Sequence, residues 1–254
     1  MAKSLAYFAI LFCPAVLLSS SSNPDFNFLT GKFEPKEHTE FIQVPQSNGT
    51  RAGLYLQKQT LDAFLKMANA AKKEHVSLYV LSATRNFNQQ KSIWEAKYLG
   101  KRRVGGELLP EAYPDGRSRA LVILKYSSMP GTSRHHWGTD LDISYLHENV
   151  GPMLSNSAWE QGEGLKAYYW MRKNAYKYGF CQPYQGTPRE RSNGSYEHGY
   201  LEEKWHWSYY PLARKLTEQY SKYKDSMQPS GFAGSEFGIE FYLQYVLNVA
   251  AECK

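Results

Sequence analysis

The sequence predicts an α+β fold: a single domain in which helices flank a small antiparallel sheet. The chain has 254 residues, and domains usually have roughly 50–250 residues, so one domain is expected. Its composition, 42% hydrophobic and 21% charged, is sufficient for a buried core. Segments with helical periodicity occur together with short segments rich in β-branched and aromatic residues, which predicts both kinds of element.

The first 22 residues have the order of regions found in secretory signal peptides. Lys3 precedes an apolar run from Leu5 to Leu18, and serines follow at 19–22. The run has about 14 residues, fewer than the ~20 of a membrane-spanning helix. We therefore expect 1–22 to be a signal peptide and the protein to be exported to the periplasm or cell envelope. An uncleaved signal that acts as an anchor is the alternative.

The next segments predict an arm, a helix and a strand. Residues 23–50 contain Pro, Asn and Gly, and we expect an extended N-terminal arm there. Residues 56–75 predict an amphipathic helix. Its apolar residues have the i, i+3, i+4, i+7 spacing: Leu61, Phe64, Leu65 and Ala68. Residues 76–85 are β-branched and aromatic, as is typical of a strand.

The middle of the chain predicts two helices separated by a loop. Residues 87–99 are helix-like, with Asn88 as the candidate N-cap. Residues 100–118 are rich in Gly and Pro and predict a loop that could cover a cleft. Residues 117–128 fit either a helix or a strand, and we predict a short helix.

The last third predicts two helices and a strand. Residues 162–180 are helical in pattern, and the aromatic segment 204–210 is strand-like. From Gly231 onward the pattern predicts a C-terminal helix. The expected organisation is a domain at 51–226 followed by a C-terminal helical extension at 227–254.

Charge and cysteine content limit the partners and the compartment. The net charge is +6, but no run of five basic residues occurs, so nucleic acid is not expected as a partner. A mild positive charge suits a protein that works near anionic cell-wall polymers. Removal of the signal leaves Cys181 and Cys253, which could form a disulfide in an oxidising compartment or remain two buried thiols. The oligomeric state is left open.

The segment "SRHHWGTDLDIS" (133–144) concentrates potential metal ligands. It contains two histidines and two aspartates: His135, His136, Asp140 and Asp142. In a strand, alternate residues share a face, so both aspartates would point the same way. Gly138 permits a turn that brings a histidine back toward them. One His and one Asp could therefore bind a zinc ion, and spacing alone does not say which. A turn-capping role for the aspartates is the alternative.

A third ligand is expected in "EEKWHWSYY" (202–210). His206 lies between Trp205 and Trp207, which would pack on the opposite face of a strand. Glu203, three residues earlier, could accept a proton from water at the metal. A satisfied core histidine is the competing interpretation of His206. The H-E-x-x-H motif of helical zinc peptidases is absent from the sequence.

These motifs resemble those of the VanY-like zinc D-alanyl-D-alanine carboxypeptidases, a group related to lysostaphin-type peptidases and hedgehog domains. Residues 133–142 fit S-x-H-x-x-G-x-x-x-D, and "EKWHW" (203–207) fits the second motif, E-x-W-H. "SATRNFNQQ" (82–90) resembles the S-x-x-R-S-x-x-x-Q segment, and 170–180 resembles the helix between the metal motifs. The resemblance covers roughly residues 50–215.

The resemblance implies a role for each matching residue. The Zn²⁺ ligands would be His135, Asp142 and His206, on the small sheet. Glu203 would be the general base and Arg85 a cation near the scissile carbonyl. The substrate would contact Ser133 and Gln90, which with Arg85 would also read a free C-terminal carboxylate. His136 and Asp140 fall on variable positions and are not expected to be ligands. The family commonly has Ala where this chain has Asp140, Pro in place of Lys204 and Ser in place of Asn86.

The implied activity is removal of the terminal D-alanine from peptidoglycan stem peptides by metal-activated water. An L,D-carboxypeptidase or a stem-peptide endopeptidase would use the same motifs, so both remain alternatives. A non-catalytic cell-wall or peptide-binding module of the hedgehog type is an alternative of a different class. Beyond an uncleaved signal anchor, no stable membrane partner is expected.

Overall fold

The structure is a computed structural model that describes residues 24–148, 153–186 and 199–253. It confirms the α+β fold with small antiparallel sheets. The expected signal peptide (1–22) lies outside the described residues. Within the described ranges, no helix is both long enough and apolar enough to cross a membrane.

The main sheet has four antiparallel strands in the order β3-β4-β6-β5. Their bounds are β3 (Tyr79–Ser82), β4 (Asp140–Ser144), β5 (Phe180–Cys181) and β6 (His206–Tyr209). A separate pair joins β1 (Phe41–Gln43) to β2 (Tyr55–Gln57). The segments that carry the metal motifs therefore form β4 and β6, which are neighbours in the sheet.

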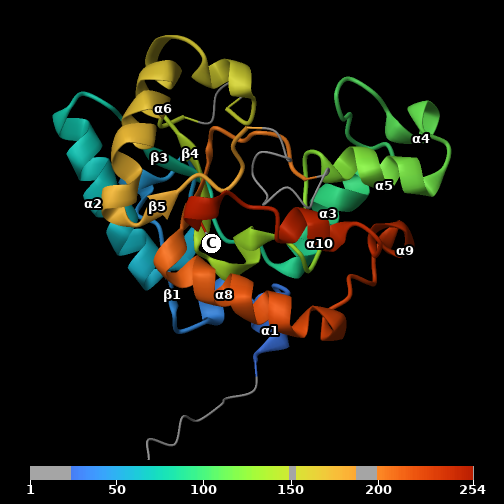
Figure 1. Cartoon of the computed structure of the whole chain (residues 1–254). Coiled ribbons are helices and arrows are strands. Elements are labelled where there is room, and N and C mark those ends of the chain that lie inside the picture. The colour runs from blue at the N-terminus through green and yellow to red at the C-terminus, as the bar shows by residue number, and fades with distance from the viewer. Residues whose placement is uncertain (1–23, 149–152, 187–198, 254) are drawn as a thin grey trace, which may run out of the picture.

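Helices surround the sheet. The longer ones are α2 (Lys58–Lys73), α3 (Phe87–Tyr98), α5 (Gly116–Leu124), α6 (Gly162–Asn174) and α8 (Tyr210–Tyr223). The short ones are α1 (Phe26–Leu29), α4 (Leu109–Ala112), α9 (Ser235–Gly238) and α10 (Tyr242–Val246). Helices α2 and α6 lie on one side, and α3, α5 and α10 lie on the other (Figure 1).

Two hydrophobic clusters hold these layers together. One packs α2 and α6 against the sheet through Leu141, Ile143 and Trp207. The other joins α3, α5 and α8 to the C-terminal segment. Because side chains alternate along a strand, burial of Leu141 and Ile143 on one face turns Asp140 and Asp142 to the other. The predicted division of the two faces of β4 is thus confirmed.

Several local expectations were wrong. The N-cap of α3 is Asn86, not Asn88, because Asn86 Oδ1 accepts the Gln89 N–H at 2.8 Å and Gln89 Oε1 accepts the Asn86 N–H at 2.9 Å. The arm at 23–50 is folded, since it contains α1 and β1. The loop at 100–118 contains α4 and the start of α5.

The C-terminal segment also differs from the single helix expected from Gly231 onward. It forms α9, α10 and a 3-10 turn at Ala251–Cys253. Gly234 precedes α9 with a φ of +79°, a left-handed conformation that interrupts helical structure. Tyr242 and Val246 are buried in the cluster with α3 and α5, so the segment contributes to the core.

Candidate metal centre

A short 3-10 helix at Arg134–Trp137 presents the first histidine. Ser133 caps it, because the Ser133 Oγ accepts the His135 N–H at 3.2 Å. Gly138 ends it with a φ of +68°, and a Cβ at that position would lie 2.3 Å from the Phe41 ring. Only glycine fits there, and the turn leads directly into β4.

The register of β4 and β6 brings the other two candidate ligands together. Asp142 is the cross-strand partner of His206, and Asp140 is the partner of Ser208. Directly opposite residues of an antiparallel pair lie on the same face of the sheet. The pairing therefore joins two residues, Asp142 and His206, that are 64 positions apart in the sequence (206 minus 142).

The three side chains converge on one point. The Asp142 Oδ1 lies 3.4 Å from the His135 Nε2 and 3.3 Å from the His206 Nδ1. One ligand atom from each of these three buried residues lies within 4.8 Å of the others. The buried Asp142 Oδ1 has no hydrogen-bond partner among the described residues. Two imidazole nitrogens and a carboxylate oxygen are a donor set that suits zinc, so these residues fit the metal implied by the resemblance.

Hydrogen bonds orient both imidazoles. The His135 Nδ1 lies 2.9 Å from the carbonyl oxygen of Ala83, which leaves Nε2 to face Asp142. The His206 Nε2 lies 3.1 Å from the Asp140 Oδ1, which leaves Nδ1 to face Asp142 and Glu203. Such partners fix the ring orientation and tautomer of metal-binding histidines.

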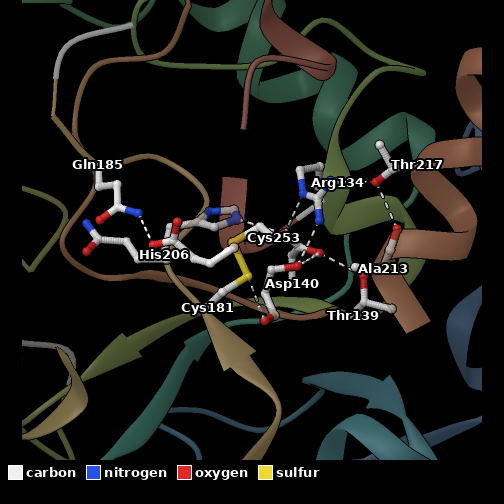
Figure 2. Close-up of a disulfide and its surroundings, with 12 residues drawn as sticks. Arg134, Thr139, Asp140, Cys181, Gln185, His206, Ala213, Thr217 and Cys253 are labelled. Atoms are coloured by element: carbon white, nitrogen blue, oxygen red, sulfur yellow. Dashed lines mark hydrogen bonds and ion pairs between the residues drawn. A yellow bond between two sulfur atoms is a disulfide. The ribbon is translucent and has the colours of Figure 1, made fainter. Parts of the chain in front are cut away.

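Asp140 is itself held by a buried arginine that the sequence analysis did not single out. Arg134 donates from Nε to the Asp140 Oδ1 at 2.8 Å, and the two side chains are 1% and 0% exposed. Arg134 also donates to the Ser208 hydroxyl and to the hydroxyl of Thr217, which Figure 2 labels. Asp140 lies outside the cluster of His135, Asp142 and His206, and its hydrogen bond orients the His206 ring.

Glu203 lies beside the cluster because the chain turns just before β6. The His206 N–H donates to the Glu203 carbonyl oxygen at 3.3 Å, which closes a four-residue turn. This turn places the Glu203 Oε2 3.3 Å from the His206 Nδ1. The Glu203 side chain remains 15% exposed, so it can reach both the cluster and the adjoining pocket.

Electrostatics reinforce the arrangement. Burial opposes ionisation of Asp142, but the imidazoles of His135 and His206 outweigh it and hold the pKa of Asp142 well below its usual range. Burial also disfavours a charged His206 ring, but the nearby carboxylates of Asp140, Asp142 and Glu203 prevail and raise its pKa well above the ordinary value. The cluster is thus rich in negative charge and attracts a cation.

Arg85 supplies a positive group at the edge of the cluster. Its backbone is fixed on both sides, since its N–H donates to the His135 carbonyl oxygen and its own carbonyl oxygen lies 2.7 Å from the His136 Nδ1. Burial lowers the pKa of Arg85, while the charges of Asp142 and Glu203 oppose that shift. His136 is buried and its pKa is lowered to about 3, mainly by burial, so it remains neutral and structural.

A pocket of about 550 Å³ opens beside the cluster. Its walls include Arg85, Gln90, Ser133 and Glu203 together with the three candidate ligands. Clefts of ≈ 300–1,000 Å³ are typical of sites for small ligands, and this volume is sufficient for a short peptide end. The sequence-derived site residues are thus together at one cavity, and their individual roles remain predictions.

Cys181 and Cys253 form a disulfide and are not two separate buried thiols. Cys181 and Cys253, 72 residues apart, are joined with a Cα–Cα distance of 5.7 Å. Cys181 is the cross-strand partner of Ser208, whose hydroxyl donates to Asp140 at 3.0 Å. The bond therefore anchors the C-terminus next to the strand that carries His206 (Figure 2).

Two curated proteins are similar to parts of this chain. The protein named "Putative carboxypeptidase YodJ" of Bacillus subtilis is 29% identical over 147 residues, which are 58% of this chain and 45% of that protein. A D-alanyl-D-alanine carboxypeptidase of Enterococcus faecalis is 25% identical over 163 residues, 64% of this chain and 50% of the relative. This chain therefore spans about half the length of these curated relatives.

The fold has a solved counterpart. The structure of the LdcB LD-carboxypeptidase matches 82% of this chain and 79% of its own, with a TM-score of 0.51 and 23% identity. Residues 53–212 of this chain match the family model described as VanY, D-alanyl-D-alanine carboxypeptidase. That range includes the converging histidines and aspartate, the neighbouring glutamate and the arginine at the pocket. The chain belongs to the VanY D-alanyl-D-alanine carboxypeptidase family.

Proposed function

We propose that the protein is a zinc-dependent D-alanyl-D-alanine carboxypeptidase that removes the terminal D-alanine from peptidoglycan stem peptides. The observation that carries the proposal is the convergence of His135, Asp142 and His206 on one point with Glu203 alongside. Family membership and the name of the Enterococcus faecalis relative support the reaction class.

The three clustered side chains would hold the ion. Zinc bound there would supply a Lewis acid and lower the pKa of water toward ~7. Glu203 then accepts a proton from the attacking water, because its carboxylate lies at the edge of the cluster and faces the pocket. It passes this proton to the departing amine. Arg85 stabilises the negative charge that develops on the carbonyl oxygen.

Other pocket residues position the peptide. The Ser133 Oγ already accepts the His135 N–H, so its own hydrogen remains available for a substrate acceptor. Gln90 donates from Nε2 to the Ser128 carbonyl oxygen at 2.8 Å, which leaves its Oε1 to accept from a substrate N–H. Both residues therefore present polar atoms that can align a peptide in the pocket.

We also propose that the protein works outside the cytoplasm, in the periplasm or cell envelope. The signal-like first 22 residues support this location. The disulfide supports it independently, because such bonds persist mainly in oxidising compartments.

Incubation of the purified protein with stem pentapeptide and tetrapeptide, with and without a chelator, tests the proposal. Chelator-sensitive release of D-alanine from the pentapeptide alone is expected. Release from the tetrapeptide would instead show an L,D-carboxypeptidase, and cleavage inside the stem would show an endopeptidase. Binding of the peptides without any released product would favour a non-catalytic module.

A further inference from the structure

Helix α3 places a lysine in the wall of the substrate pocket. Lys97 follows Gln90 by seven residues, so the two lie on one face of the helix. Both line the pocket, and Lys97 is only 8% exposed. Lysines are almost never this buried unless they are paired with a negative group.

Lys97 has no such group in the described parts of the chain. Its Nζ donates to the Ser127 Oγ, and no described carboxylate lies within ion-pair distance of it. An ammonium has three donors, so a neutral hydroxyl satisfies only part of its capacity. Burial and the positive charges of Arg102 and Arg85 lower the pKa of Lys97 to about 8, and the Glu203 carboxylate opposes that shift. An anion in the pocket would relieve both the desolvation and the repulsion.

Gln90, on the same face of α3, is a weaker partner for an anion than an ammonium group. The Gln90 Nε2 donates one of its two N–H groups to the Ser128 carbonyl oxygen, and its Oε1, which has no partner among the described residues, would repel a carboxylate. The two side chains are held by consecutive residues, because the Lys97 Nζ donates to the Ser127 Oγ and the Gln90 Nε2 donates to the Ser128 carbonyl oxygen. Arg102 and Arg103 also line the pocket and make its potential more positive on this side.

We propose that Lys97 is a specificity-determining residue that binds a carboxylate of the substrate peptide. The inference rests on the proposed function. The carboxylate could be the free C-terminus or that of an inner acidic residue of the stem, and both offer the same chemistry to an ammonium. Arg85 is then free to act at the scissile carbonyl, because a separate cation anchors the peptide.

Binding measurements with Lys97→Met test this proposal. Both the variant and its parent carry Glu203→Gln, so that peptides bind without turnover. Three probes are compared: the free stem pentapeptide, its C-terminal amide, and a pentapeptide amidated at its inner acidic residue. We expect Lys97→Met to weaken binding of the free peptide about 10- to 100-fold, the range of a charge-assisted hydrogen bond. The loss should disappear for the one probe that lacks the carboxylate bound by Lys97.

Matched controls separate this role from a structural one. Lys125→Met removes an exposed lysine that lines the same pocket, and we expect less than a twofold effect. Lys97→Arg should restore most of the affinity. Lys97→Met should unfold at the same temperature as its parent or higher, because it removes a desolvated charge.

The outcomes are distinct. An equal loss for all three probes, or no loss for any of them, would overturn the role of Lys97 but leave the proposed function unaffected. A parent protein that binds none of the probes would overturn the proposed function together with this inference.

Discussion

At the scale of single residues, the two nitrogens of His206 have different tasks. Asp140 holds Nε2, and this leaves Nδ1 to face Asp142, where the proposed ion would bind. Arg134 in turn fixes the Asp140 carboxylate through a hydrogen bond of 2.8 Å. The buried series of hydrogen bonds from Arg134 to Asp140 to His206 therefore fixes the orientation of the His206 ring.

Replacement of Asp140 tests whether this residue orients His206 for zinc binding. We expect Asp140→Asn to weaken zinc binding about 10- to 100-fold, the usual cost of losing a partner of a metal-binding histidine. Competition with a chromophoric chelator measures the affinity. Thr217→Val is the control, because Thr217 contacts Arg134 but not Asp140. Its zinc affinity should stay within about twofold of the wild-type value. Unchanged affinity in Asp140→Asn would contradict an orienting role.

Glu203 should affect turnover and not metal content. Glu203→Gln keeps the shape of the side chain but cannot accept a proton, so we expect turnover to fall roughly 10²- to 10⁴-fold. Glu202→Gln is the matched control, because Glu202 is the adjacent residue and lines the same pocket. Zinc content, measured alongside, should remain that of the wild type. Wild-type turnover in Glu203→Gln would rule out the proposed base.

Metal affinity should depend on pH through His206. Its pKa is raised above the ordinary value of about 6.5, so its proton is still bound where an unperturbed imidazole would have lost it. A metal must displace that proton, and affinity should fall as the pH drops below the raised pKa. Chelator competition at pH 6, 7 and 8 should show weaker binding at each lower pH, by at most about tenfold per unit for one displaced proton. A flat profile would contradict this.

At the scale of elements, the disulfide ties β5 to the C-terminus. It closes a segment whose ends are 72 residues apart. Within that segment lies β6, the strand that carries His206. The bond therefore limits how far the C-terminal segment can separate from the sheet.

Loss of the disulfide should destabilise the protein. We expect Cys181→Ser combined with Cys253→Ser to lower the free energy of unfolding by about 2–5 kcal/mol, the usual range for a native disulfide. Urea titration of both proteins under oxidising conditions measures the difference. Wild-type protein in a reductant is the control and should show a similar loss. Equal midpoints for the oxidised wild type and the double variant would contradict a stabilising role.

Elements with a strong period or a clear motif could be predicted from the sequence. The stripe of Leu61, Phe64 and Ala68 predicted α2, and the aromatic pattern around His206 predicted β6. The C-terminal segment could not be predicted as short helices, because its apolar residues serve a core shared with α3 and α5. Such tertiary contacts are not encoded in local periodicity.

The residues of the candidate site also divide into those that the sequence could indicate and those that it could not. The resemblance to the family motifs singled out His135, Asp142, His206 and Glu203, which the structure brings together, whereas spacing alone did not say which His and which Asp. Their roles as ligands and base stay predictions. Arg134 could not, because its importance depends on Asp140, Ser208 and Thr217, which approach it from three different elements. Lys97 also shows no motif, and only its burial in the pocket wall marks it.

At the scale of the whole molecule, the sheet brings two distant motifs into one centre, and the rest of the fold supports it. Helices α2 and α6 fix the opposite face of β4 and β6, and the other hydrophobic cluster holds α3 with its pocket residues. The central claim is that this arrangement binds a single divalent ion.

Metal stoichiometry of the full chain tests that claim most directly. Elemental analysis after gentle purification and equilibration with zinc should find one zinc per wild-type chain, and much less than one in His206→Ala. His75→Ala, which removes a histidine outside the cluster, should retain the full amount. A wild-type protein without bound zinc, or a His206→Ala variant with undiminished zinc, would contradict the account.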